Sequence, residues 1–153
     1  MDLLNFNTIE LHDPNINIEL TIDENDFLKR IGMKKNNLGF YNFLSHITDE
    51  HIYVQVFINF KENLNTIQIV TIGSESLIDK ATGIIYSDTK YTNLLGDFVI
   101  NNFGKPTLLT RIFSKLNKPF YIHKWKYKDI NITHKYQDSH DGLQESLIFE
   151  IHK

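Results

Sequence analysis

Hydrophobic and polar residues alternate over several stretches of the chain, which is typical of strands that bury one face. In the clearest stretch, residues 15–22, the apolar side chains fall on every second position and are Ile16, Ile18, Leu20 and Ile22. This spacing predicts a half-buried strand.

A second alternating stretch, residues 51–60, is followed by the polar sequence KEN and by an apolar stretch that runs back to Ile72. Two such stretches around a short connection predict a β-hairpin, and residues 40–46 predict one more strand before it. Further strands are predicted near the C-terminus, at residues 120–127, 130–136 and 145–152. Lys128 and Asp129 then form one turn and residues 137–144 another, since Asp141 and Gly142 are typical turn residues.

In three other stretches apolar residues recur at steps of three and four, and this spacing predicts helices. The first follows the acidic start of DENDFLKRIGMKK and ends within residues 32–37. The second spans residues 87–102 and is ended by Gly104 and Pro106. The third spans residues 107–116, although its sequence LLTRIF leaves a strand open as an alternative.

Together these elements predict an α+β fold, a mainly antiparallel sheet of about six to seven strands with two to three helices packed on it. A chain of 153 residues with 41% hydrophobic and 23% charged residues fits one globular domain. We therefore expect residues 1–153 to form a single domain.

The chain contains no cysteine, which excludes disulfides and thiolate-bound metals. It also lacks a leader-like start and any apolar run close to the roughly 18 residues of a membrane span. Asparagine, isoleucine and lysine are abundant, as in proteins from AT-rich bacterial genomes. We expect a cytoplasmic bacterial protein with no membrane partner.

Sequence motifs for catalysis are missing, because neither a GxSxG elbow nor a glycine-rich phosphate loop occurs. We expect no enzyme activity and no cofactor. One alternative stays open, a small metal-dependent hydrolase. In an antiparallel meander His123 and His134 can face each other, and Asp138 or Asp141 would complete a two-histidine, one-carboxylate site.

Charge is distributed unevenly along the chain, whose net charge is −3. Residues 105–135 hold eight lysines and arginines against a single acid, Asp129, with several aromatic residues between them. Such a segment can bind nucleic acid or another anion. Alternatively, Lys124 and Lys126 line the solvated face of an edge strand whose aromatic residues face the core.

The N-terminal third is acidic, with nine acidic and four basic residues among residues 1–50. Acidic groups on one surface steer a basic protein partner, and aromatic side chains are the usual anchors of such interfaces. The residues expected to form the partner-binding site are Asp23, Glu24, Asp26, Asp49, Glu50, Tyr53 and Phe57.

The C-terminal part carries a short motif, FGKPT at residues 103–107, followed by a predicted strand with Trp125 and Tyr127. This order resembles the two-helix, three-strand module of the BamE/SmpA and beta-lactamase-inhibitor-protein group. The resemblance implies a binding scaffold. BamE itself is anchored through an acylated cysteine, and this chain has none.

The size, the composition and the missing catalytic motifs also resemble immunity proteins of contact-dependent growth inhibition and other polymorphic toxin systems. This resemblance implies a protein that binds a cognate toxin, often a nuclease, and occludes its active site. We take toxin inhibition as the leading hypothesis, with nucleic-acid or anion binding and metal-dependent hydrolysis as the alternatives.

Overall fold

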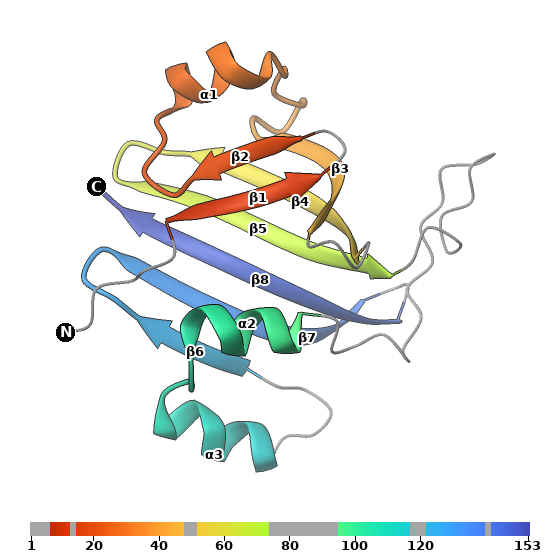
Figure 1. Cartoon of the computed structure of the whole chain (residues 1–153), viewed down its shortest axis with the longest axis vertical. Coiled ribbons are helices and arrows are strands. Elements are labelled where there is room, and N and C mark those ends of the chain that lie inside the picture. The colour runs from red at the N-terminus through yellow and green to blue at the C-terminus, as the bar shows by residue number, and fades with distance from the viewer. Residues whose placement is uncertain (1–6, 13–14, 48–51, 74–94, 117–121, 140–141) are drawn as a thin grey trace.

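Eight antiparallel strands form one sheet in the order β2-β1-β3-β4-β5-β8-β7-β6 in the computed structural model (Figure 1). The structure describes residues 7–12, 15–47, 52–73, 95–116, 122–139 and 142–153. The strands are β1 (Thr8–His12), β2 (Ile16–Glu19), β3 (Tyr41–Ile47), β4 (Ile52–Phe60), β5 (Leu64–Gly73), β6 (Ile122–Lys126), β7 (Ile130–Ser139) and β8 (Gly142–His152). The helices are α1 (Glu24–Ile31), α2 (Gly96–Phe103) and α3 (Leu108–Leu116). The predicted α+β class is confirmed, and β1 is a strand that the pattern of alternation did not predict.

One face of the sheet forms the core, because the buried side chains of neighbouring strands lie in register. Ile58 of β4 is opposite Ile67 of β5, which is opposite Phe149 of β8. We call this side the buried face and the opposite side the outer face. The β4–β5 hairpin is confirmed, with its turn at the predicted KEN sequence.

The β1–β2 hairpin covers part of the buried face. Only the end of β1 pairs with β3, through Leu11 and His12, so the rest of the hairpin is free to diverge from the sheet. In Figure 1 it crosses in front of β4 and β5, and Ile9 and Ile18 belong to the same apolar cluster as the central strands.

Helix α1 forms where the sequence predicts it, since both of its ends are specified locally. The Asp23 carboxylate accepts the backbone N–H of Asp26 at 2.9 Å and caps the first turn. Gly32 ends the helix with a φ of 66°, a conformation that other residues adopt only with strain. Phe27 is fully buried and packs against Tyr41 and Phe60 on the buried face.

Helices α2 and α3 follow one another around Gly104. Phe103 of α2 packs on the buried face, with its ring centroid 5.8 Å from those of Trp125 and Phe149. The predicted helix at 87–102 is wrong at Leu95, because Leu95 is the N-cap and α2 begins at Gly96. The cap predicted at Ser87 and Asp88 lies outside the described residues. Helix α3 confirms the third predicted helix and lies beside the edge strand β6 (Figure 1). No helix in the described part of the chain is long and apolar enough to cross a membrane.

The turn predicted at residues 137–144 is wrong in its bounds. Strand β7 continues to Ser139 and β8 begins at Gly142, with Gln137 paired to Gln144. Polar side chains suggested a loop, but antiparallel pairing uses backbone groups that every one of these residues carries. Residues 140 and 141 lie outside the described part.

Candidate functional site

Three of the eight strands, β3, β4 and β5, carry no charged residue on the outer face of the sheet. These strands have 7, 9 and 10 residues, and none of the 26 is Asp, Glu, Lys or Arg. About half of these residues face outward, so at the chain average of 23% charged residues about three would be expected on this surface. Since α1 and α2 both pack on the buried face, neither helix covers this uncharged surface.

A hollow of about 540 Å³ opens on the outer face, within the usual size range of ligand-binding sites. Phe57 of β4 lies in its wall, with its ring centroid 5.8 Å from that of Phe40. The described lining residues are neutral, and they are Phe40, Gln55, Phe57, Asn59, Thr66, Gln68, Val70 and Gln144. Amide side chains both donate and accept hydrogen bonds, and none of these described residues carries a carboxylate, imidazole or amine for acid–base chemistry. The hollow is therefore suited to binding.

Tyr53, the second predicted aromatic anchor, projects from the same face of β4 as Phe57, because the two residues are four positions apart on one strand. Its ring lies 5.5 Å from that of His46, which stacks on His12 at 5.7 Å. The structure thus places both predicted anchors on the outer face.

The predicted acidic residues lie on another part of the molecule. Asp23, Glu24 and Asp26 surround the start of α1, which packs on the buried face through Phe27. Asp49 and Glu50 fall outside the described residues. The acidic residues at α1 and the aromatic anchors are therefore not brought together on one surface.

Glu24 has a structural role that the sequence did not reveal. Its Oε1 accepts the Lys35 ammonium at 2.6 Å and the Tyr41 hydroxyl at 2.9 Å, which ties α1 to β3 and to the loop before it. The bond from Lys35 lowers the pKa of Glu24 below its ordinary value of 4.5. Burial, followed by the bond to Glu24, raises the pKa of Tyr41 to about 12.

We expect Glu24→Gln to lower the free energy of unfolding at neutral pH by about 1 to 2 kcal/mol, because two hydrogen bonds to a charged acceptor are weakened. A carboxyl with a lowered pKa stabilises the fold at pH values above its ordinary pKa. This contribution is lost as pH falls below about 4.5. Urea denaturation at neutral pH and at a pH below about 4.5 measures the free energy of unfolding under the two conditions. The control Asp26→Asn removes an exposed charge that pairs with Lys29 at 3.5 Å, and it should cost at most about 0.5 kcal/mol. Equal losses in the two variants would contradict the role of Glu24.

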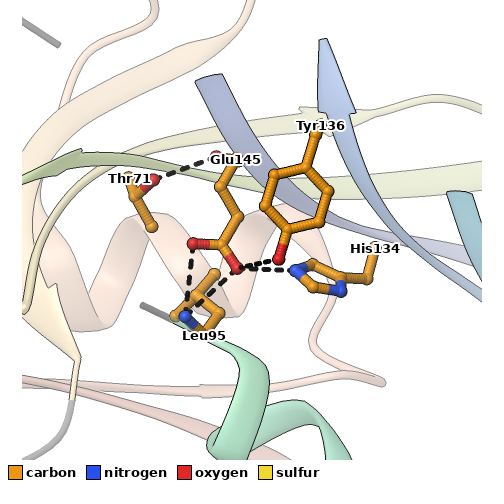
Figure 2. A network of polar contacts seen from close by, with 5 residues as sticks. All are labelled: Thr71, Leu95, His134, Tyr136 and Glu145. Carbon is orange, nitrogen blue, oxygen red and sulfur yellow. Dashed lines mark hydrogen bonds and ion pairs between the residues drawn. The ribbon is translucent and has the colours of Figure 1, made fainter. Parts of the chain in front are cut away.

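The described part of the chain also contains a buried polar network between β7, β8 and α2 (Figure 2). Glu145 Oε1 accepts His134 Nε2 at 2.6 Å and the Tyr136 hydroxyl at 3.4 Å. The backbone N–H of Leu95 donates to both carboxylate oxygens, at 3.1 and 3.2 Å. Thr71 Oγ1 donates to the Glu145 backbone carbonyl at 3.3 Å.

This network holds the start of α2 against the sheet. Leu95 precedes the first residue of α2, so the Glu145 carboxylate meets the positive end of the helix and satisfies an N–H that has no partner within the helix. His134 is only 2% exposed and Glu145 only 1% exposed, so the pair is closed to a substrate in this conformation. Its position supports a structural role. The sequence did carry a signal, because Glu145 lies on the buried side of the apolar alternation in β8.

The predicted cross-strand pair of His123 and His134 is confirmed, with ring centroids 5.7 Å apart. The side chains of Asp138 and Asp141, which the metal hypothesis needs, lie outside the described part. Within the described residues, no three histidine or carboxylate side chains form a group that could hold a metal ion. Burial, and then the neighbouring His134, lowers the pKa of His123 below 6.5.

A lowered histidine pKa makes protonation costly in the folded state, so its contribution to stability is present above pH 6.5 and is lost as pH falls below that value. We expect the free energy of unfolding of His123→Gln to decrease less steeply with acidification than that of the unmodified chain. Denaturant titrations at several pH values measure this. At pH 8 an unperturbed histidine is neutral, so the difference in free energy of unfolding between His123→Gln and the unmodified chain reports packing alone. Parallel curves of this free energy against pH would contradict the prediction.

The basic, aromatic segment is divided between two environments. Lys124 and Lys126 are exposed on β6, whereas Trp125 between them is buried and donates its Nε1–H to the Gly104 carbonyl at 3.1 Å. The Tyr127 hydroxyl donates to the Phe103 carbonyl at 3.4 Å. These two aromatic residues pack with α2, which favours the edge-strand alternative over base stacking.

Comparison with protein-family models, with curated proteins and with solved structures finds no match for this chain. The similarities to the BamE/SmpA group and to immunity proteins therefore remain predictions.

Proposed function

We propose that this protein is a bacterial inhibitor of the immunity-protein class that binds a cognate protein toxin through the outer face of β3, β4 and β5 and occludes its active site. The observation that carries the proposal is the charge-free surface of these three strands around the hollow at Phe57. Cytoplasmic location belongs to the same proposal.

Protein interfaces differ from the remaining surface chiefly in the depletion of charged residues and the enrichment of aromatic residues at their centre. The outer face of β3, β4 and β5 has both properties, since these strands carry no charged residue and present Tyr53 and Phe57. Exposed sheet faces are ordinarily rich in charged and polar residues, so the uncharged composition requires an explanation other than solubility.

The hollow would receive a side chain of the toxin, with Phe57 as the anchor and the surrounding amides as orienting groups. Gln55 Nε2 already donates to Asn42 Oδ1 at 3.1 Å, which fixes one of these amides before binding. An ordered binding surface loses less entropy on association. The acidic residues of α1 are assigned to folding, since Asp23 caps the helix and Glu24 holds Lys35 and Tyr41.

The direct test uses the purified chain and the toxin domain encoded beside its gene. We expect a stoichiometric complex by size-exclusion chromatography and loss of toxin activity in that complex. A gene neighbourhood without a secreted toxin, or a complex in which the toxin stays active, would contradict the proposed inhibition. Binding to heparin or nucleic acid that weakens steeply with salt would favour the alternative function.

A further inference from the structure

Helix α3 exposes three apolar side chains to solvent. Leu108 is 63% exposed, Leu109 69% and Ile112 49%. These positions lie on one side of a helix, because residues one and four apart from Leu108 fall within the same arc. An amphipathic helix in a globular protein ordinarily turns this arc toward the core. The burial of apolar surface on folding therefore does not explain the orientation of α3. Such conflicts between local sequence and structure mark functional sites.

The surroundings of this arc are strongly basic. Between residues 98 and 128 the chain holds seven of its 16 lysines and arginines and none of its 19 acidic residues. Lys105 and Arg111 are exposed beside the arc, and Lys124 and Lys126 are exposed on the neighbouring strand β6. Since the net charge of the chain is −3, this positive charge is a local property of the region around α3.

Contact between α3 and β6 places the basic strand next to the helix. The Thr107 N–H, one residue before α3, donates to the Lys124 carbonyl at 3.1 Å. In Figure 1, α3 lies at the end of the molecule, beyond β6 and away from the central strands. An approaching flat surface can therefore meet the leucines of α3 together with the lysines of β6.

We propose that α3 is a peripheral membrane-binding element that docks on an anionic phospholipid bilayer. Leu108, Leu109 and Ile112 would enter the boundary between headgroups and acyl chains, while the surrounding lysines and arginine would bind lipid phosphates. This combination of an apolar arc and flanking basic residues is characteristic of helices that lie in the membrane interface. An acidic protein would also attract the charges, but the proposal commits to lipid because three leucine and isoleucine side chains are presented on one convex helix.

The expectation of no membrane partner was drawn from the absence of a spanning segment, and surface binding needs no such segment. The proposal is independent of the toxin-binding face, because α3 and Phe57 belong to different parts of the molecule.

The test is co-sedimentation of the full chain with phosphatidylcholine vesicles that contain or lack phosphatidylglycerol. We expect binding to the anionic vesicles at low salt and at least about tenfold weaker binding to pure phosphatidylcholine, as well as in high salt. The double variant Leu108→Ser, Leu109→Ser should weaken binding to the anionic vesicles about tenfold, with circular dichroism unchanged, because both side chains are exposed.

Leu38→Ser is the matched control, since Leu38 is an apolar residue that is 81% exposed but lies outside the basic segment. It should bind anionic vesicles as the unmodified chain does. Equal binding to both vesicle types, equal losses in the control and the double variant, or no vesicle binding would each overturn the proposal. Capture of an acidic protein by α3 without vesicle binding would also overturn it and identify a protein as the occupant.

Discussion

Glu145→Ala should lower the free energy of unfolding by about 3 to 5 kcal/mol, more than the loss expected from Glu24→Gln. The substitution leaves His134 Nε2 and the Leu95 N–H buried without the carboxylate to which both donate. It also removes the 3.4 Å hydrogen bond from the Tyr136 hydroxyl. Each buried donor that loses its partner keeps its full desolvation cost. Because native domains are stable by only about 5 to 15 kcal/mol, this loss is a large fraction of the total.

Guanidinium denaturation followed by tryptophan fluorescence measures the effect. The only tryptophan of the chain, Trp125, packs against Phe103 of α2, so its emission reports whether α2 stays docked. Glu150→Ala is the matched control in the same strand, on the outer face, and should change stability by at most about 0.5 kcal/mol. A loss below about 1 kcal/mol for Glu145→Ala would show that the network does not hold α2 in place.

Phe57→Lys should weaken the toxin complex at least about 30-fold, which corresponds to about 2 kcal/mol of binding free energy. The change removes the aromatic anchor and places a charge in a hollow whose described lining residues are all neutral. Burying an ammonium without a partner is costly, so the effect should exceed that of Phe57→Ala. Isothermal titration with the toxin domain measures the affinity.

Gln68→Lys provides a second variant in the same hollow and should also weaken binding, because Gln68 of β5 lies directly opposite Phe57. The thermal midpoint of both variants should stay close to that of the unmodified chain, since both side chains project from the outer face. Wild-type affinity in both variants would place the interface elsewhere.

The sequence was sufficient where a structure is specified by neighbouring residues. Asp23 and Gly32 fix the two ends of α1. The alternation in residues 15–22 identifies β2, but the strand ends at Glu19, so Leu20 and Ile22 are buried outside it. Strand β1 was missed although Ile9 and Leu11 alternate with polar residues in its five-residue sequence and are both buried. The position of Glu145 at the start of α2 was also unpredictable, because a residue 50 positions later in the chain supplies this cap.

The candidate site was predictable only in part. Tyr53 and Phe57 were identified as anchors, but their separation from the acidic start of α1 depends on which face each strand turns to the core. That choice is made by the register between distant strands, which the sequence of one strand does not specify. The sequence does show that residues 41–47, 52–60 and 64–73 contain no charged residue, and this absence could have indicated the uncharged surface.

A side-by-side titration of Phe57→Lys and Asp26→Lys against the toxin domain tests the central claim most directly. Asp26 is an exposed acidic residue on α1, at the surface first expected to meet a basic toxin. If the uncharged outer face binds the toxin, Phe57→Lys loses at least about 30-fold in affinity while Asp26→Lys stays within about threefold of the unmodified chain. Weak binding by Asp26→Lys together with normal binding by Phe57→Lys would contradict the account and assign the interface to the acidic residues of α1.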